Sequence, residues 1–140
     1  PVLQLAGALE AGRVREALRR LRRGEWVARF PEGEMRYPGP LGPLREGANW
    51  LARKAGVPLL PVALRVVLRG YEHPEAFLWV GRPLPPGGDL GRALGGLLQA
   101  LDALLAKTHP REVPEGFREV LRGRRSLEER VLPLVRLLRP

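Results

Sequence analysis

The chain has 140 residues, a formal net charge of +9 and no cysteine. This length suits one domain with its own hydrophobic core, and the lack of cysteine excludes a disulfide framework, a thiolate nucleophile and a cysteine-based metal site. All but two of the 24 basic residues are arginine, whose planar guanidinium pairs with phosphate through two hydrogen bonds, so the charge predicts an anionic partner.

The composition also bears on where the protein resides. No apolar run reaches the length of a membrane span and no signal-peptide pattern opens the sequence, so we expect a cytoplasmic protein. Abundant arginine, proline and leucine fit either a thermophile or a GC-rich genome, and composition does not separate these two origins.

The first elements in chain order are a short apolar start and a basic helix. Residues 2–5 suit a strand, followed by a connecting turn. Residues 13–23 are predicted to form a helix with an apolar side on the sheet and a solvated basic side, and Gly24 ends it. Arg13 lies at the helix N-terminus, where free backbone N–H groups favour anions, so it is a candidate phosphate ligand.

The next segment is predicted to deliver a carboxylate to the edge of a sheet. Residues 25–30 suit a β-strand by side-chain shape, and Pro31 and Gly33 end it. Glu32 therefore lies on a turn at the carboxyl end of a strand, which is where open α/β sheets bind ligands. Gly33 has no Cβ, so a ligand or a neighbouring backbone can approach it closely.

A helix and a second strand are expected to complete one βαβ unit. Residues 36–42 are rich in proline and glycine and are predicted to be a loop. Residues 43–55 predict a helix that Gly56 ends. Residues 57–64 form a nearly unbroken apolar run, typical of a strand buried on both faces of a parallel sheet. We expect the helical crossover between the two strands to be right-handed.

The second half of the chain is predicted to be mostly helical. Residues 64–70 continue or border the preceding strand, and residues 75–81 suggest another strand. Asp89 caps a predicted helix to about Lys107, residues 114–121 suit a short helix, and Ser126 opens a last helix with a capping box. The apolar side of that last helix comprises Leu127, Val131, Leu134, Val135 and Leu138. We therefore predict a single α/β domain over residues 1–140, with a mostly parallel sheet flanked by helices, a core at 13–83 and a helical part at 89–140.

Three motifs in order resemble the glycerolipid acyltransferases, which include the lysophosphatidic acid and glycerol-3-phosphate acyltransferases. They are Phe30-Pro31-Glu32-Gly33, then Gly47-Ala48 in a helix, then Val57-Pro58-Leu59-Leu60-Pro61-Val62. The resemblance implies transfer of a fatty acyl group from an acyl thioester, on coenzyme A or acyl carrier protein, to a hydroxyl of a phosphorylated glycerol or lysophospholipid. It implies no bound cofactor and no metal, since the thioester is the activated co-substrate.

The sequence departs from the family at two places. Glu34-Met35-Arg36 stands where the family has Thr-Arg-Ser, so Arg36 lies one residue later than the family's arginine. The family's catalytic His-x-x-x-x-Asp motif is absent, because His73 and His109 are followed five residues later by Leu78 and Pro114. We therefore expect no catalytic residue in this chain, and either an N-terminal part of the enzyme that precedes it or a chain that has lost the chemistry.

The resemblance implies an acceptor site at the turn. Three roles for Glu32 remain open: orienting an arginine, bonding an acceptor hydroxyl, or accepting a hydrogen bond from a backbone N–H. The expected acceptor-binding residues are Phe30, Pro31, Glu32, Gly33, Arg36 and Arg13.

A second class of function fits the same charge. The chain could be a catalytically silent module that binds anionic lipid surfaces or nucleic acid through its arginines. Nucleic acid is not expected, because aromatic residues make up only 6% and no nucleic-acid-binding motif is present. The basic, amphipathic C-terminal segment adds an anionic membrane surface as a candidate partner, at the inner face of the cell membrane.

Overall fold

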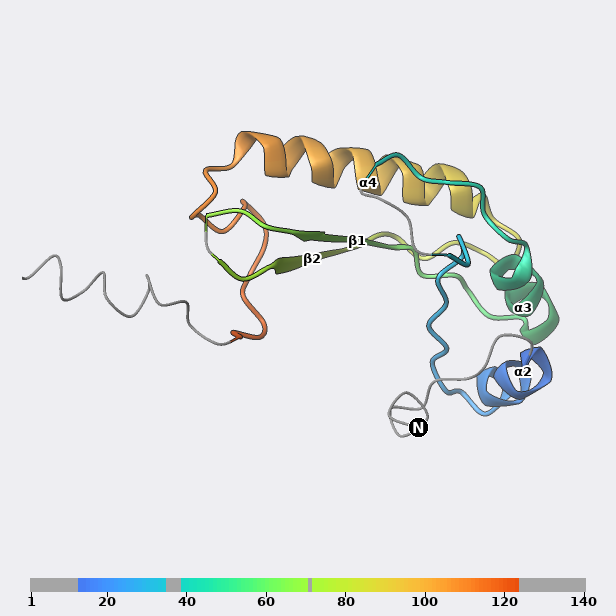
Figure 1. Cartoon of the computed structure of the whole chain (residues 1–140). Helices are drawn as coiled ribbons and strands as arrows, with labels where there is room; N and C mark the ends of the chain where they lie inside the picture. The colour runs from blue at the N-terminus through green and yellow to red at the C-terminus, as the bar shows by residue number, and fades with distance from the viewer. Residues whose placement is uncertain (1–12, 35–38, 71, 124–140) are drawn as a thin grey trace, which may run out of the picture.

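The computed structural model describes residues 13–34, 39–70 and 72–123 (Figure 1). Within them the chain forms helix α2 (Val14–Arg22), helix α3 (Gly47–Ala55), strand β1 (Val62–Val67), strand β2 (Glu75–Val80) and helix α4 (Leu90–Lys107). The protein is thus a mixed α/β structure. The helices predicted at 13–23 and 89–107 and the strand at 75–81 are confirmed to within one residue. Among the described helices, none has the length and apolarity needed to cross a bilayer.

The two strands form an antiparallel sheet. Val62 pairs with Val80 at one end and Val67 with Glu75 at the other. The prediction of a mostly parallel sheet is therefore wrong for the described residues. The seven residues between the strands are too few for the crossover that a parallel pair requires, so the chain reverses as a hairpin.

The predicted strand at 25–30 is also wrong. This segment pairs with no described strand, and its aromatic residues face solvent, with Trp26 87% and Phe30 78% exposed. Side-chain shape favours an extended backbone here, but a strand also needs a hydrogen-bonded neighbour. The apolar run at 57–64 likewise becomes a strand only from Val62, preceded by an isolated bridge between Leu59 and Leu84.

Helix α4 covers one face of the sheet. The Asp89 side chain caps its N-terminus by accepting a hydrogen bond from Arg92 N at 2.9 Å, as predicted. Its buried leucines repeat at helical spacing and pack on the inward side chains of the strands, which forms the core. The central buried residues are Ala63, Phe77, Leu98 and Leu101.

The opposite face of the sheet is open. Alternate side chains of β1 and β2 point away from α4, and their large apolar members are Val62, Leu64, Val66, Leu78 and Val80, all exposed. A strand buried on both faces, as the apolar run predicted, is therefore not what the described residues form.

Two further expectations need correction. Helix α3 begins at Gly47 instead of near Pro43, because the Arg45 N–H donates to the carbonyl of Pro31 at 2.8 Å and holds residues 43–45 in a non-helical path. Residues 114–121 do not form a helix; they turn at 115–116, and Phe117 packs edge-on against Phe77 and Trp79. The expected elements at 2–5 and after Ser126 lie outside the described residues.

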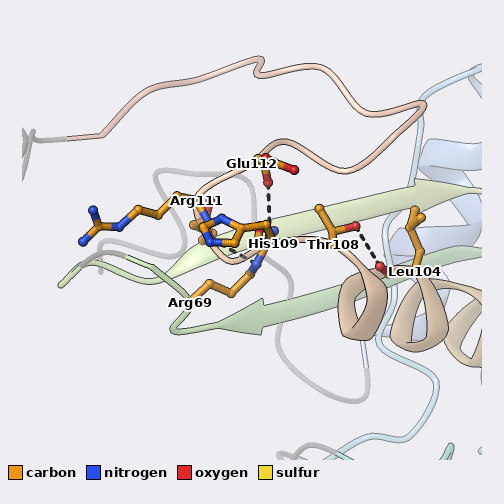
Figure 2. Close-up of polar contacts among 7 residues, drawn as sticks. Arg69, Leu104, Thr108, His109, Arg111 and Glu112 are labelled. Atoms are coloured by element: carbon orange, nitrogen blue, oxygen red, sulfur yellow. Dashed lines mark hydrogen bonds and ion pairs between the residues drawn. The ribbon is translucent and has the colours of Figure 1, made fainter.

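Arg69, at the end of the hairpin, contacts residues 109–112 after α4 (Figure 2). Its largely buried guanidinium donates through Nη2 to the carbonyls of His109 at 2.7 Å and Glu112 at 3.0 Å. The Thr108 hydroxyl donates to Leu104 O at 2.8 Å and closes the last turn of the helix. These contacts let the chain leave α4 and pass the edge of the sheet.

Candidate functional site

The 30–33 turn is held closed by the loop that follows it. Gly33 N–H donates to Phe30 O at 3.1 Å, and Gly33 has a φ of +71°, which a residue with a side chain rarely adopts. Glu32 Oε1 accepts a hydrogen bond from Gly42 N at 2.7 Å in a partly buried setting. Of the three roles left open for Glu32, this contact is the acceptance of a hydrogen bond from a backbone N–H. It fixes the carboxylate beside the turn.

A guanidinium lies directly against Gly33. A Cβ built on Gly33 would meet the Arg45 side chain, with Nε at 2.5 Å. In the same way, a Cβ on Gly47 would lie 3.4 Å from Nη2 of Arg29. Among the residues described, the side chains of Arg29 and Arg45 make no hydrogen bond or ion pair. Both cations are therefore available to an anion near the turn.

Arg65, near the 30–33 turn, is held in place by hydrogen bonds to Asp102 and Gly39. Its Nε and Nη2 contact Oδ1 and Oδ2 of Asp102 at 2.7 and 2.8 Å, and Nη2 also donates to Gly39 O at 2.7 Å. The hydrogen bond to Asp102 raises the pKa of Arg65, against the opposing effect of burial, and the charges of Asp102 and Glu32 raise it further. Arg65 therefore ties α4 to the loop that carries Gly42, within electrostatic reach of Glu32.

The same contact makes stability depend on pH. The hydrogen bond from Arg65 lowers the pKa of Asp102 below its ordinary value of 3.8, so this pair stabilises the fold above pH 3.8. The contribution is lost as pH falls through the lowered pKa, because the unfolded chain then takes up the proton first. Asp102 is half exposed, so we expect about 1 kcal/mol. Urea denaturation at pH 6 and pH 2.5 should show Asp102→Asn losing less stability on acidification than the natural chain; equal losses would contradict this.

The structure brings together part of the predicted site. Pro31 and Glu32 are half-buried and Gly33 is exposed, next to Arg45. Arg36 lies outside the described residues. Arg13 precedes the first residue of α2, as predicted, and lies in an open depression that the 30–33 turn does not line. The residues around that depression are Arg13, Val14, Arg15, Glu16, Arg19 and Trp50.

Sequence reasoning missed Arg29 and Arg45. The sequence pattern predicts Arg45 in a helix that begins near Pro43 and Arg29 in a strand, so it places neither side chain beside a glycine. A usable signal was present for Arg45 alone, which has no carboxylate three or four residues away, the spacing of a helical ion pair.

The side chains of the two histidines contact near neighbours in the sequence. His73 Nε2 lies 3.5 Å from Glu72 Oε1, and His109 Nδ1 accepts from Arg111 N at 3.3 Å (Figure 2). Within the described part of the chain, no three metal-ligating side chains gather into a cluster. Arg29, Arg45, the fixed carboxylate of Glu32 and the position without a side chain at Gly33 form an arrangement that can bind and orient an anion with neighbouring hydroxyls.

Comparison with known proteins identifies the segment that contains this site. Residues 7–65 match the acyltransferase family model. An N-acylphosphatidylethanolamine synthase of Arabidopsis thaliana is 36% identical over 84 residues, which cover 57% of this chain and 28% of that protein. The chain therefore spans little more than a quarter of the length of this relative. No solved structure matches. The 30–33 turn, Gly47 and the 57–62 run all lie within the matched range.

Proposed function

Residues 7–65 belong to an acyltransferase domain, and from that premise we propose that the protein holds the acceptor during acyl transfer to a phosphorylated glycerol or lysophospholipid. The family resemblance found in the sequence is confirmed at the level of this domain and of the distant relative. The relative is named for an N-acylated phosphatidylethanolamine, which favours a phosphorylated glycerolipid among the acceptors.

The reaction has a simple balance. The acceptor hydroxyl attacks the thioester carbonyl of the acyl donor, an ester C–O bond forms, the C–S bond breaks, and the hydroxyl proton passes to a base and then to the leaving thiol. The donor is an acyl thioester on coenzyme A or acyl carrier protein. The 140 residues contain no His-x-x-x-x-Asp motif to act as that base. Our proposal therefore assigns acceptor binding, and not proton transfer, to this chain.

The observation that carries the proposal is the position of Arg45 against Gly33. Arginine binds phosphate through paired hydrogen bonds, and the missing side chain of Gly33 lets that guanidinium lie against the turn. Glu32 is held next to them by Gly42, so its second carboxylate oxygen can accept a hydrogen bond from an acceptor hydroxyl. The high net charge adds attraction for anionic lipid, and we place the protein at the cytoplasmic face of a membrane on that ground.

Arg45→Ala should weaken binding of glycerol 3-phosphate about tenfold, because one charge-assisted contact to phosphate is lost. Isothermal titration of glycerol 3-phosphate, with glycerol as the uncharged comparison, measures this. The matched control is Arg82→Ala, an exposed arginine on the connector before α4, which should bind as the natural chain does.

Two outcomes would overturn the proposal. One is equal affinity in Arg45→Ala and Arg82→Ala. The other is binding to vesicles that contain phosphatidylglycerol without any binding of glycerol 3-phosphate, which would instead support a catalytically silent, lipid-surface module.

A further inference from the structure

A depression in the surface lies between helices α2 and α3. The two helices pack against each other (Figure 1), and the depression is open to solvent and has a volume of about 650 Å³. This volume falls within the range of about 300–1,000 Å³ that small-molecule sites occupy. Neither the 30–33 turn nor Arg45 lines it. The depression is therefore a second candidate binding site.

The lining of the depression is cationic. Arg13, Arg15 and Arg19 line it together with one carboxylate, that of Glu16. Arg19 Nη2 contacts Glu16 Oε2 at 2.6 Å, and Arg20 Nε lies 3.5 Å from Glu16 Oε1, so the charge of this carboxylate is already balanced. Arg15 is exposed and makes no hydrogen bond or ion pair among the described residues. Because Arg15 and Arg19 are four residues apart on one side of α2, both can contact the same anion.

The lining also contains one aromatic ring. Trp50 of α3 is 39% exposed, so its indole is partly accessible to a ligand in the depression. A nucleobase stacks on such a ring, while neighbouring arginines bind the phosphates that the nucleotide carries. An anion without a base would use the arginines alone. Guanidinium groups beside an accessible tryptophan therefore fit a purine nucleotide better than a simple phosphate.

The depression and the acceptor site border the same helix. Gly47 is the first residue of α3 and lies against Arg29, and Trp50 follows it by three residues. Residues three apart lie on one side of a helix, and three residues advance only about 5 Å along its axis. A long, flexible ligand whose one end is bound at Trp50 can therefore extend toward an acceptor held at the turn.

We propose that this depression binds the nucleotide end of a coenzyme A thioester, with the adenine stacked on Trp50 and the phosphates on Arg15 and Arg19. The inference rests on the proposed function, because it selects coenzyme A over acyl carrier protein as the acyl donor. An acidic carrier protein would contact the arginines, but it has no base to stack on the Trp50 ring.

Isothermal titration of the full chain with adenosine 3′,5′-bisphosphate, which reproduces the adenine, ribose and 3′-phosphate of coenzyme A, tests the proposal. Arg15→Ala should weaken its binding about tenfold, because one charged contact to phosphate is lost. Trp50→Leu should weaken it by about the same factor through the loss of stacking. Arg15 is an exposed side chain, so its variant should fold even if Trp50→Leu does not. The matched controls are Arg82→Ala and Trp26→Leu, both exposed and outside the depression, which should bind as the natural chain does.

Two further titrations separate this donor site from the acceptor site. Arg45→Ala should bind the bisphosphate as the natural chain does, and Arg15→Ala should bind glycerol 3-phosphate as the natural chain does. Bisphosphate binding that is absent while glycerol 3-phosphate binds would remove the donor site and leave the proposed function in place. The reverse result would remove the acceptor site and leave the donor site in place.

Three other results would overturn the donor site. The first is equal affinity for the bisphosphate in Arg15→Ala and Arg82→Ala. The second is equal affinity of the natural chain for pyrophosphate, which has the charge without the base, or for AMP, which lacks the 3′-phosphate. The third is binding of acyl carrier protein by a chain that does not bind the bisphosphate, which would identify the carrier protein as the donor.

Discussion

Replacing Glu32 by alanine should weaken glycerol 3-phosphate binding by about 10- to 100-fold, because one charged hydrogen-bonding group is worth about 1.5–3 kcal/mol. Glu32 has two roles in this account. Its Oε1 accepts the Gly42 N–H at 2.7 Å and so shapes the loop, and its other oxygen is free to meet the acceptor. The alanine variant loses both, and calorimetric titration and urea denaturation together measure the two losses.

Glu32→Gln separates the loop contact from the charge. Glutamine keeps a carbonyl oxygen for the Gly42 N–H, so this variant should stay within about 1 kcal/mol of the natural stability. Its binding should fall between that of the natural chain and the alanine variant. If Glu32→Ala binds glycerol 3-phosphate as the natural chain does, Glu32 has no part in acceptor binding.

Gly33→Ala should cost stability and binding together. Gly33 has a φ of +71°, where a side chain costs about 1–2 kcal/mol, and the new methyl group would displace the Arg45 guanidinium. We expect a binding loss of about tenfold or more, since the cation moves away from the turn. Thermal unfolding and glycerol 3-phosphate titration measure the two effects on the same sample.

Gly24→Ala is the matched control for backbone strain. Gly24 has a similar φ of +80°, and a Cβ there would meet nothing within 4 Å. This variant should lose a similar amount of stability and bind normally. Normal binding by Gly33→Ala, or an equal binding loss in both variants, would show that the contact with Arg45 does not matter.

Elements with strong local signals could be predicted from sequence. Helix α4 follows from its leucine spacing and from Asp89, whose side chain satisfies a free N–H of the first turn. Gly56 ends α3 in a left-handed conformation with a φ of +67°, as its position after the helix indicated. These signals depend only on residues within one or two helical turns of each other, so they can be recognised from the sequence alone.

Strand partners and side-chain neighbours could not be predicted, because they depend on distant residues. Residues 25–30 have the right side chains for a strand but no described partner, and only the end of the 57–64 run, from Val62, pairs with β2, in antiparallel orientation. Arg45 faces Gly33 only because its own N–H bonds to Pro31, a contact across fourteen residues that overrides the helical pattern. The sequence predicts a turn at residues 30–33, but it does not place Arg45 beside that turn.

The most direct test of the account is to locate glycerol 3-phosphate on the protein by NMR. In a titration of the ¹⁵N-labelled chain, the backbone amides of Gly33 and Gly42 should shift in a saturable way, and the side-chain Nε–H of Arg45 should shift with them. Amides of the hairpin end near Arg69 should stay in place. Saturable shifts that appear elsewhere and leave Gly33, Gly42 and Arg45 unchanged would contradict an acceptor site at this turn.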